Sequence, residues 1–234
     1  MLKENIIISL GGSLVAPNDI DTAFLKMFKR AVTKFLDTRR FFVFVGGGKV
    51  CRNYQKALLE FGADNKERDW MGINISRLNA EIVKQVFDKV AFDKVLTDPT
   101  KIVNSRKDVA VFGGWKPGWS TDYCAVMLAK NMGIKTIVNL TNIDYVYDLP
   151  AGRQARTQQD FENAGAKPFT QIDWKSFRRI VGDKWIPGLS VPFDPRASKM
   201  AEILKIKVIM INGAHLDRLE HFLQNKPFIG TTIS

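Results

Sequence analysis

Short apolar runs alternate along the chain with longer segments in which apolar residues recur every three or four positions. The short runs are rich in β-branched and aromatic residues and are continuous rather than alternating, which is typical of strands buried on both faces of a parallel sheet. They predict strands over residues 5–10, 41–45, 109–112, 136–140 and 207–211. The longer segments predict helices over residues 20–36, 50–61, 70–90, 121–131 and 197–204. This alternation predicts an α/β fold, a three-layer α/β/α sandwich with a mainly parallel open sheet.

Residues 149–169 follow neither pattern. The stretch contains two prolines, two glycines and three basic residues but few apolar ones, so we expect an exposed loop or insertion there. The chain shows no repeats and no linker, and its 234 residues suit one domain. We therefore expect a single domain over residues 1–234, with two lobes over about 1–134 and 135–234.

The composition narrows the class of partner. Apolar residues make up 45% of the chain and charged residues 25%, which excludes a disordered or fibrous protein. The net charge of +11 favours an anionic partner such as a nucleotide, a nucleic acid or an acidic surface. The basic residues are scattered and form no motif that enters a nucleic-acid groove, so a nucleic-acid partner is not expected.

Two cysteines make no disulfide framework, and no apolar run approaches about 20 residues. These features predict a cytoplasmic protein with no membrane contact.

Three glycine clusters each follow a predicted strand. They lie at residues 11–13, 46–49 and 113–114. The carboxyl ends of parallel strands line the ligand crevice of an open sheet, and glycines there let backbone N–H groups approach a phosphate. One such pair would be explained by a tight turn alone, but three at successive strand ends in a basic chain indicate a phosphate site.

Several common catalytic motifs are absent. The glycine clusters match neither the P-loop nor the dinucleotide fingerprint, and no zinc-protease motif, paired C-x-x-C or nucleophile elbow occurs. His215 and His221 fall in a predicted surface helix, where solvated side chains are the ordinary case.

Six blocks, in order, resemble the amino acid kinase superfamily and, within it, the archaeal-type uridylate (UMP) kinases. The blocks are SLGGSLV (9–15), VGGGKVCRNY (45–54), DWMGINISRLNA (69–80), GGWKPGWSTD (113–122), TNIDYVYD (141–148) and FDPRASKMAEI (193–203). The segment GTTI (230–233) is similar to the closing strand of that family.

The resemblance implies a phosphotransferase that uses ATP and Mg²⁺ to convert UMP to UDP in pyrimidine nucleotide biosynthesis. UMP would bind the first lobe and ATP the second, and the chain would form a homo-oligomer, a hexamer by resemblance. Two other functions remain open: a related phosphotransferase with a small phosphate or carboxylate acceptor, and a catalytically weak nucleotide-binding regulator.

The resemblance also implies a set of site residues. For ATP these are Ser9, Gly11, Gly12, Ser13, Gly47, Arg52, Thr141, Asn142, Tyr147 and Asp148. For UMP they are Gly46, Asp69, Arg77, Asn79, Trp115, Lys116, Pro117, Gly118, Trp119, Ser120 and Thr121. The candidate catalytic residues are Arg52, Asp144, Asp194 and Lys199, to which we add Lys49 from its place beside the glycine loop. No residue is predicted to bind a metal on its own.

For two pairs of these residues, a role other than binding UMP directly remains open. Arg77 and Asn79 could instead support the acceptor pocket or a subunit contact, and Trp115 and Trp119 could stack on a base or mark a subunit interface. The chain also departs from its relatives. Ser9 stands where many members of the superfamily have a lysine, Tyr145 replaces a glycine, and an Asp-Pro pair after the tyrosine is missing.

Overall fold

The computed structural model describes residues 3–101, 107–148, 158–189 and 191–234. Within them, seven strands form one sheet in the order β3-β2-β1-β4-β8-β9-β7. Their bounds are β1 Glu4–Leu10, β2 Arg39–Val45, β3 Val109–Phe112, β4 Thr136–Thr141, β7 Gln171–Ile172, β8 Lys207–Asn212 and β9 Thr231–Ile233. Every pairing is parallel except that between β8 and β9. All five predicted strands, and the closing strand implied by the resemblance, are confirmed.

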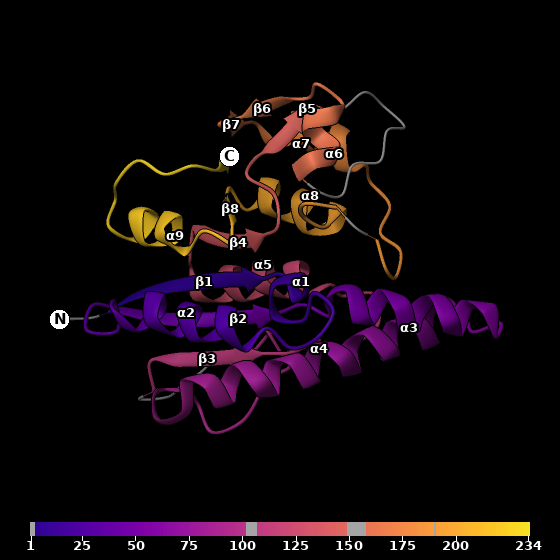
Figure 1. The fold of residues 1–234 in the computed structure, drawn as a ribbon, viewed down its shortest axis with the longest axis horizontal. Coiled ribbons are helices and arrows are strands. Elements are labelled where there is room, and N and C mark those ends of the chain that lie inside the picture. Colours follow the sequence, from indigo (N-terminus) through magenta and orange to yellow (C-terminus); the bar gives the residue numbers. More distant parts are fainter. Residues whose placement is uncertain (1–2, 102–106, 149–157, 190) are drawn as a thin grey trace.

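Helices cover both faces of this sheet (Figure 1). Their bounds are α1 Gly12–Val15, α2 Thr22–Thr33, α3 Gly48–Glu60, α4 Asn65–Phe87, α5 Thr121–Met132, α6 Gln158–Asn163, α7 Trp174–Val181, α8 Pro195–Ile203 and α9 Leu216–Leu223, with a short 3-10 helix at Asp88–Val90. One core lies between the sheet and α2, α4 and α9, and the other between the sheet and α5, α7 and α8. In β1, Ile6 and Ile8 enter the first core while Ile7 enters the second. The three-layer α/β/α prediction is confirmed.

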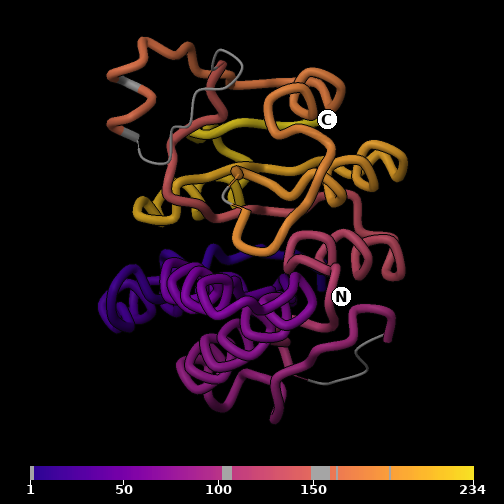
Figure 2. The backbone as a smooth tube through the Cα atoms, turned by 90° about the vertical axis from the view of Figure 1, so that its right-hand side faces the viewer, coloured from indigo at the N-terminus to yellow at the C-terminus, as the bar shows by residue number. Residues whose placement is uncertain are grey.

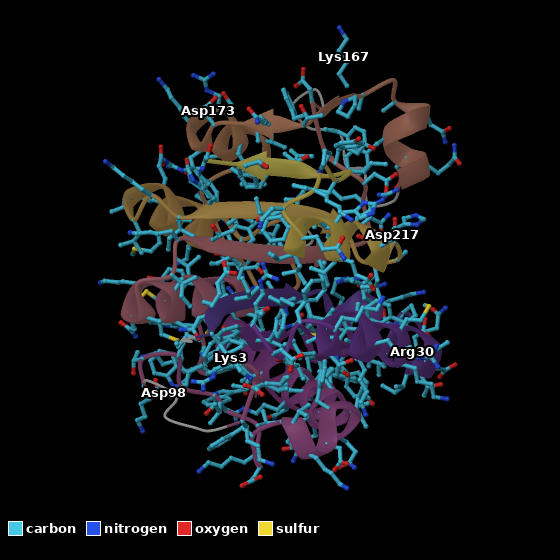
Figure 3. The ribbon with its side chains drawn as sticks, turned by 90° about the vertical axis from the view of Figure 1, so that its left-hand side faces the viewer. Lys3, Arg30, Asp98, Lys167, Asp173 and Asp217 are labelled. Carbon is cyan, nitrogen blue, oxygen red and sulfur yellow. The ribbon has the colours of Figure 1, made fainter. Side chains whose placement is uncertain are left out.

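The sheet is continuous through the middle of the molecule. Figure 2 shows the residues before about 130 below and the later residues above, and β1 pairs directly with β4 where they meet. We call these parts the N-terminal half and the C-terminal half. Charged side chains lie around the outside of both, as the labelled residues Lys3, Arg30, Lys167 and Asp217 illustrate (Figure 3).

Helix α4 begins five residues earlier than the apolar pattern predicts. Asp64 caps it by accepting a hydrogen bond from the Glu67 N–H at 2.7 Å, and Glu67 accepts one from the Asp64 N–H at 2.8 Å. This capping box stabilises a polar first turn that contains no periodic apolar residue. The predicted start at residue 70 is therefore wrong.

The expectation of a loop over residues 149–169 is wrong in part. Residues 149–157 lie outside the described part of the chain, but residues 158–163 form α6, and β6 (Lys167–Phe169) pairs with β5 (Val146–Asp148) in a separate two-stranded sheet. Phe161 is buried and stacks on Tyr147 with ring centroids 4.5 Å apart. Helix α6 is therefore stabilised by the contact of its Phe161 with Tyr147 of β5, and the sequence of the helix alone does not reveal that contact.

Candidate active site

A cavity of about 260 Å³ lies at the carboxyl ends of β1, β2 and β4. The two glycine loops that follow β1 and β2 meet there. A methyl group on Gly12 would lie 2.3 Å from the Gly46 oxygen and the Gly48 nitrogen, so the loops are in direct backbone contact. Gly48 has a φ of +71°, which a residue with a side chain rarely adopts. These glycines are needed to bring the two strand ends together.

Helix α4 holds the glycine loops in place through buried hydrogen bonds. The Ser76 hydroxyl donates to the Val45 oxygen at 2.7 Å and accepts from the Gly114 N–H at 2.8 Å. Asn79 donates to the Gly46 oxygen at 2.9 Å. Asn79 therefore supports the loop from behind, the structural alternative for this residue. The sequence analysis assigned no role to Ser76, although this residue falls inside the DWMGINISRLNA block (69–80).

The loop over residues 113–119, which we call the acceptor loop, is tied to α4. Arg77 donates through Nε to the Gly114 oxygen and through Nη2 to the Trp115 oxygen, each at 2.9 Å. The Gly118 N–H donates to Asp69 Oδ2 at 2.5 Å. Arg77 thus positions backbone rather than lining the cavity, whereas Asp69 does both. Burial raises the pKa of Asp69 above its ordinary value, and the Gly118 bond opposes that rise.

Aromatic rings from this loop form a row. Trp115 and Trp119 lie edge to face with centroids 4.6 Å apart, and Trp119 meets Tyr123 at the same distance. The Lys116 ammonium lies 3.9 Å from the Trp115 ring centroid. Only Trp119 of these residues lines the cavity. Both tryptophans pack against the second core, but Trp115 does not line the cavity and so is not positioned to stack on a base there.

Helix α5 points its N-terminus into the cavity. Ser120 caps the helix by accepting a hydrogen bond from the Tyr123 N–H at 3.1 Å, and both Ser120 and Thr121 line the cavity. The first N–H groups of a helix and its dipole favour an anion at this end.

Two carboxylates, the partly buried Asp122 and the buried Asp194, lie close together beside Ser9 of β1. Ser9 donates to Asp122 Oδ1 at 2.7 Å, and the Asp194 N–H donates to Asp122 Oδ2 at 3.1 Å. Asp194 Oδ1 caps α8 by accepting from the Ala197 N–H at 2.6 Å, while its buried Oδ2 has no hydrogen-bond partner. Burial, and then the Asp122 charge, raise the pKa of Asp194 to about 6. Burial also raises the pKa of Asp122, a residue to which sequence reasoning assigned no role.

On the side of the C-terminal half, Thr141 and Asn142 line the cavity as expected, together with Asn139. Asp144 does not line it. Its Oδ1 accepts from Asn212 at 2.8 Å and from Arg218 at 2.6 Å. Burial raises the pKa of Asp144, but these two bonds outweigh it and hold the pKa below its ordinary value. The structure places Asp144 in this ion pair and not on the wall of the cavity, and its expected role in organising a magnesium-phosphate site stays a prediction.

Four further candidates lie elsewhere in the described part of the chain. Tyr147 is buried against Phe161, and Asp148 is exposed at the end of β5, so neither lines the cavity. Lys49 is exposed and donates to Asn18 at 2.8 Å. Lys199 is exposed on α8 and lines a separate surface hollow. Neither lysine lines the cavity, although Gly47, Gly48 and Cys51 beside Lys49 do.

Arg52 lies at the glycine loops as expected. It lines the cavity, and its Nη2 donates to the Ser13 hydroxyl at 3.4 Å. Arg52 and Lys49 are both on α3, yet only Arg52 faces the cleft. The remaining candidates that line it are Ser9, Gly11, Gly12, Ser13, Gly46 and Gly47. Pro117, Lys116 and Gly118 of the acceptor loop do not.

Sequence reasoning missed the segment that closes the cleft from the C-terminal half. After α7 the chain reaches down towards α3 (orange in Figures 1 and 2), and Trp185, Gly188 and Leu189 line the cavity. Leu189 N–H donates to the Ile186 oxygen at 3.1 Å, and Arg68 of α4 donates to the Pro187 oxygen at 3.3 Å. The only local signal was the Pro-Gly pair of a tight turn.

Comparisons with known proteins identify the family of the chain. The amino acid kinase family matches residues 4–212. The uridylate kinase of Pyrococcus abyssi is 30% identical, and the match covers 97% of this chain and 98% of that protein. The uridylate kinase of Methanospirillum hungatei is 29% identical over 98% of this chain and 94% of its own length. The crystal structure of uridylate kinase from Archaeoglobus fulgidus matches with a TM-score of 0.79 at 28% identity, over 98% of this chain and 99% of that one.

The chain therefore belongs to the amino acid kinase family. The relatives that it matches over nearly their full length are uridylate kinases. In the described residues, no helix has the length and apolar character needed to cross a membrane.

Proposed function

We propose that this protein is a UMP kinase, which transfers the γ-phosphate of ATP to UMP and releases ADP and UDP. The observation that carries the proposal is the similarity to uridylate kinases along nearly the whole chain. Phosphoryl transfer depends on positioning and charge stabilisation rather than on covalent chemistry by the protein. A cleft built of backbone N–H groups, hydroxyls and one arginine suits that reaction.

UMP is proposed to bind on the side of the N-terminal half. Asp69 would accept hydrogen bonds from the ribose hydroxyls, since a carboxylate offers two acceptor oxygens. The phosphate of UMP would lie at the N-terminus of α5, where Ser120 and Thr121 supply hydroxyl donors. Trp119 is the aromatic side chain of the acceptor loop that faces this space.

ATP is proposed to bind on the side of the C-terminal half, against Thr141 and Asn142. Its γ-phosphate would lie between the two glycine loops, where the backbone N–H groups meet. Ser9 cannot replace the lysine that many family members have in the first strand, because its hydroxyl donates to Asp122. Arg52 is the cation at the glycine loops and would stabilise the transferred phosphoryl group.

Magnesium is part of the proposal. The described residues contain no cluster of three or more side chains that could hold a metal ion. That fits Mg²⁺, which is commonly held by nucleotide phosphates with one or two carboxylates. Asp122 lines the cleft, so its carboxylate would hold the ion or its waters; Asp194 does not line the cleft, but its backbone N–H helps to hold Asp122 in place. When bound, the ion neutralises charge on the phosphates.

We also propose a homo-oligomer, hexameric by resemblance, that assembles through α3 and α4. These helices lie side by side and extend beyond the sheet (Figure 1). They expose large apolar side chains, among them Phe61 just after α3 at 87% and Leu78 at 67%. Light scattering of the wild type and of Leu78→Asp tests this. The two free thiols, Cys51 and Cys124, favour the cytoplasmic location predicted for the chain.

The test of the function is ADP release with ATP and Mg²⁺ across UMP, CMP, dTMP, isopentenyl phosphate, glutamate and aspartate. Turnover with UMP above all others is expected. Arg52→Ala should lose most of it, and Lys49→Ala, with its exposed ammonium on the same helix, is the matched control. Turnover with a different acceptor would contradict the proposal. No turnover with any acceptor, while UMP or ATP still raises the melting temperature, would favour a regulator.

A further inference from the structure

Arg196 joins the C-terminal half to the acceptor loop of the N-terminal half. It lies in the first turn of α8, two residues after Asp194. Its Nη1 donates to the Gly118 oxygen at 2.5 Å, and its guanidinium carbon lies 5.1 Å from the centroid of the Tyr123 ring. Gly118 belongs to the acceptor loop, so one side chain spans the two parts of the molecule.

Gly118 is held from both sides. Its N–H donates to Asp69 and its carbonyl accepts from Arg196. Its φ of +81° is strained for any residue with a side chain, and a methyl group there would lie 3.5 Å from Arg196 Nη1. The peptide orientation at Gly118 therefore depends on two charged partners, one from α4 and one from α8.

Arg196 also contacts the row of aromatic rings formed by Trp115, Trp119 and Tyr123. Arg196 stacks on Tyr123, Tyr123 meets Trp119, and Trp119 lines the cleft. Arginine suits this position because its planar guanidinium donates at its edge and stacks with its face, which an ammonium does less well.

We propose that Arg196 is a positioning residue for the phosphate acceptor: it fixes Gly118 and Tyr123, and through them the acceptor loop, against the helix that Asp194 caps. Its side chain is exposed and belongs to neither core, so it acts on the loop rather than on the stability of the fold. Its effect on an acceptor rests on the proposed function, but its effect on the loop does not.

The test compares Arg196→Ala and Arg196→Lys with Arg179→Ala, which removes the same charge from an exposed position on α7. The first measurement is amide hydrogen exchange of residues 113–123 without nucleotides. Losing one of the two anchors should speed exchange of this segment by about threefold or more in Arg196→Ala, to a smaller extent in Arg196→Lys, and not in Arg179→Ala. The melting temperature should stay close to that of the wild type in all three variants.

The second measurement is steady-state kinetics. Arg196→Ala should raise the KM for UMP by about fivefold or more while the KM for ATP changes by less than about twofold, and Arg196→Lys should recover part of the loss. Unchanged loop exchange in Arg196→Ala overturns the proposal. So does an equal change in both KM values accompanied by a lower melting temperature, since that indicates a general structural effect. A wild type that does not phosphorylate UMP refutes the proposed function, whereas the exchange experiment still decides the positioning role.

Discussion

Replacing Asp194 by Asn should make the protein more stable at neutral pH than the wild type. Asp194 is 4% exposed, its Oδ2 has no hydrogen-bond partner, and the Asp122 carboxylate lies close enough to act on it. A buried carboxylate in this setting destabilises the fold whenever it is ionised. Asn keeps a side-chain oxygen that can cap α8 by accepting from the Ala197 N–H, as Asp194 does.

The magnitude follows from the pKa of Asp194. Burial first, and the Asp122 charge second, raise it from 3.8 to about 6. The native state therefore binds this proton more tightly than the unfolded state does. The stability that the neutral carboxyl contributes is fully present below about pH 4 and is lost as the pH rises through about 6. A shift of about two pKa units corresponds to about 3 kcal/mol, of which about 2 kcal/mol is lost between pH 4.5 and 7.5.

The assay is urea unfolding of both proteins at those two pH values and at one protein concentration. The free energy of unfolding of Asp194→Asn minus that of the wild type should increase by about 2 kcal/mol from pH 4.5 to 7.5. The capping bond favours the ionised carboxylate and is already included in the pKa of Asp194, so only the part of the cap effect that does not depend on pH cancels in this comparison. Asp217→Asn, at an exposed position in the first turn of α9, is the control and should show a nearly constant difference. A difference for Asp194→Asn that stays constant within about 0.5 kcal/mol would refute the reasoning.

Three further predictions follow from the cleft. Ser76→Ala leaves the Val45 oxygen and the Gly114 N–H without their buried partner, so urea unfolding should show a loss of about 2 kcal/mol; no loss would mean that another donor and acceptor replace the hydroxyl. Turnover should fall by about tenfold or more in Arg52→Ala and by less than about twofold in Lys49→Ala, because only Arg52 faces the cleft; equal losses in the two variants would contradict this placement. Chelating magnesium with EDTA should abolish turnover without changing the melting temperature of the nucleotide-free protein, since the described residues hold no cluster suited to a structural metal; a large drop in that temperature would show that a metal stabilises the fold.

The local sequence determined the sheet and the glycine loops at the ends of its strands. The strands are continuous apolar runs because both faces of the sheet are covered, and that burial is encoded residue by residue. The glycines of the first two loops are equally local signals, since only glycine allows the backbones at Gly12 and Gly46 to touch. Helix α7 could also have been predicted, because Trp174, Phe177 and Val181 recur at helical spacing and are buried.

Tertiary structure alone decided which charged side chains belong to the cleft. Lys49 and Arg52 are three residues apart on α3, and only the packing of that helix sends one to Asn18 and the other to the glycine loops. Asp144 meets Arg218 across 74 positions of sequence. The physical reason is that the spacing of apolar residues indicates which positions of a segment are buried. The partner of a polar side chain depends instead on which distant elements of the chain pack beside it. The segment around Trp185 and the link from Arg196 to Gly118 arise in the same way, because they exist only after the C-terminal half has packed against the N-terminal half.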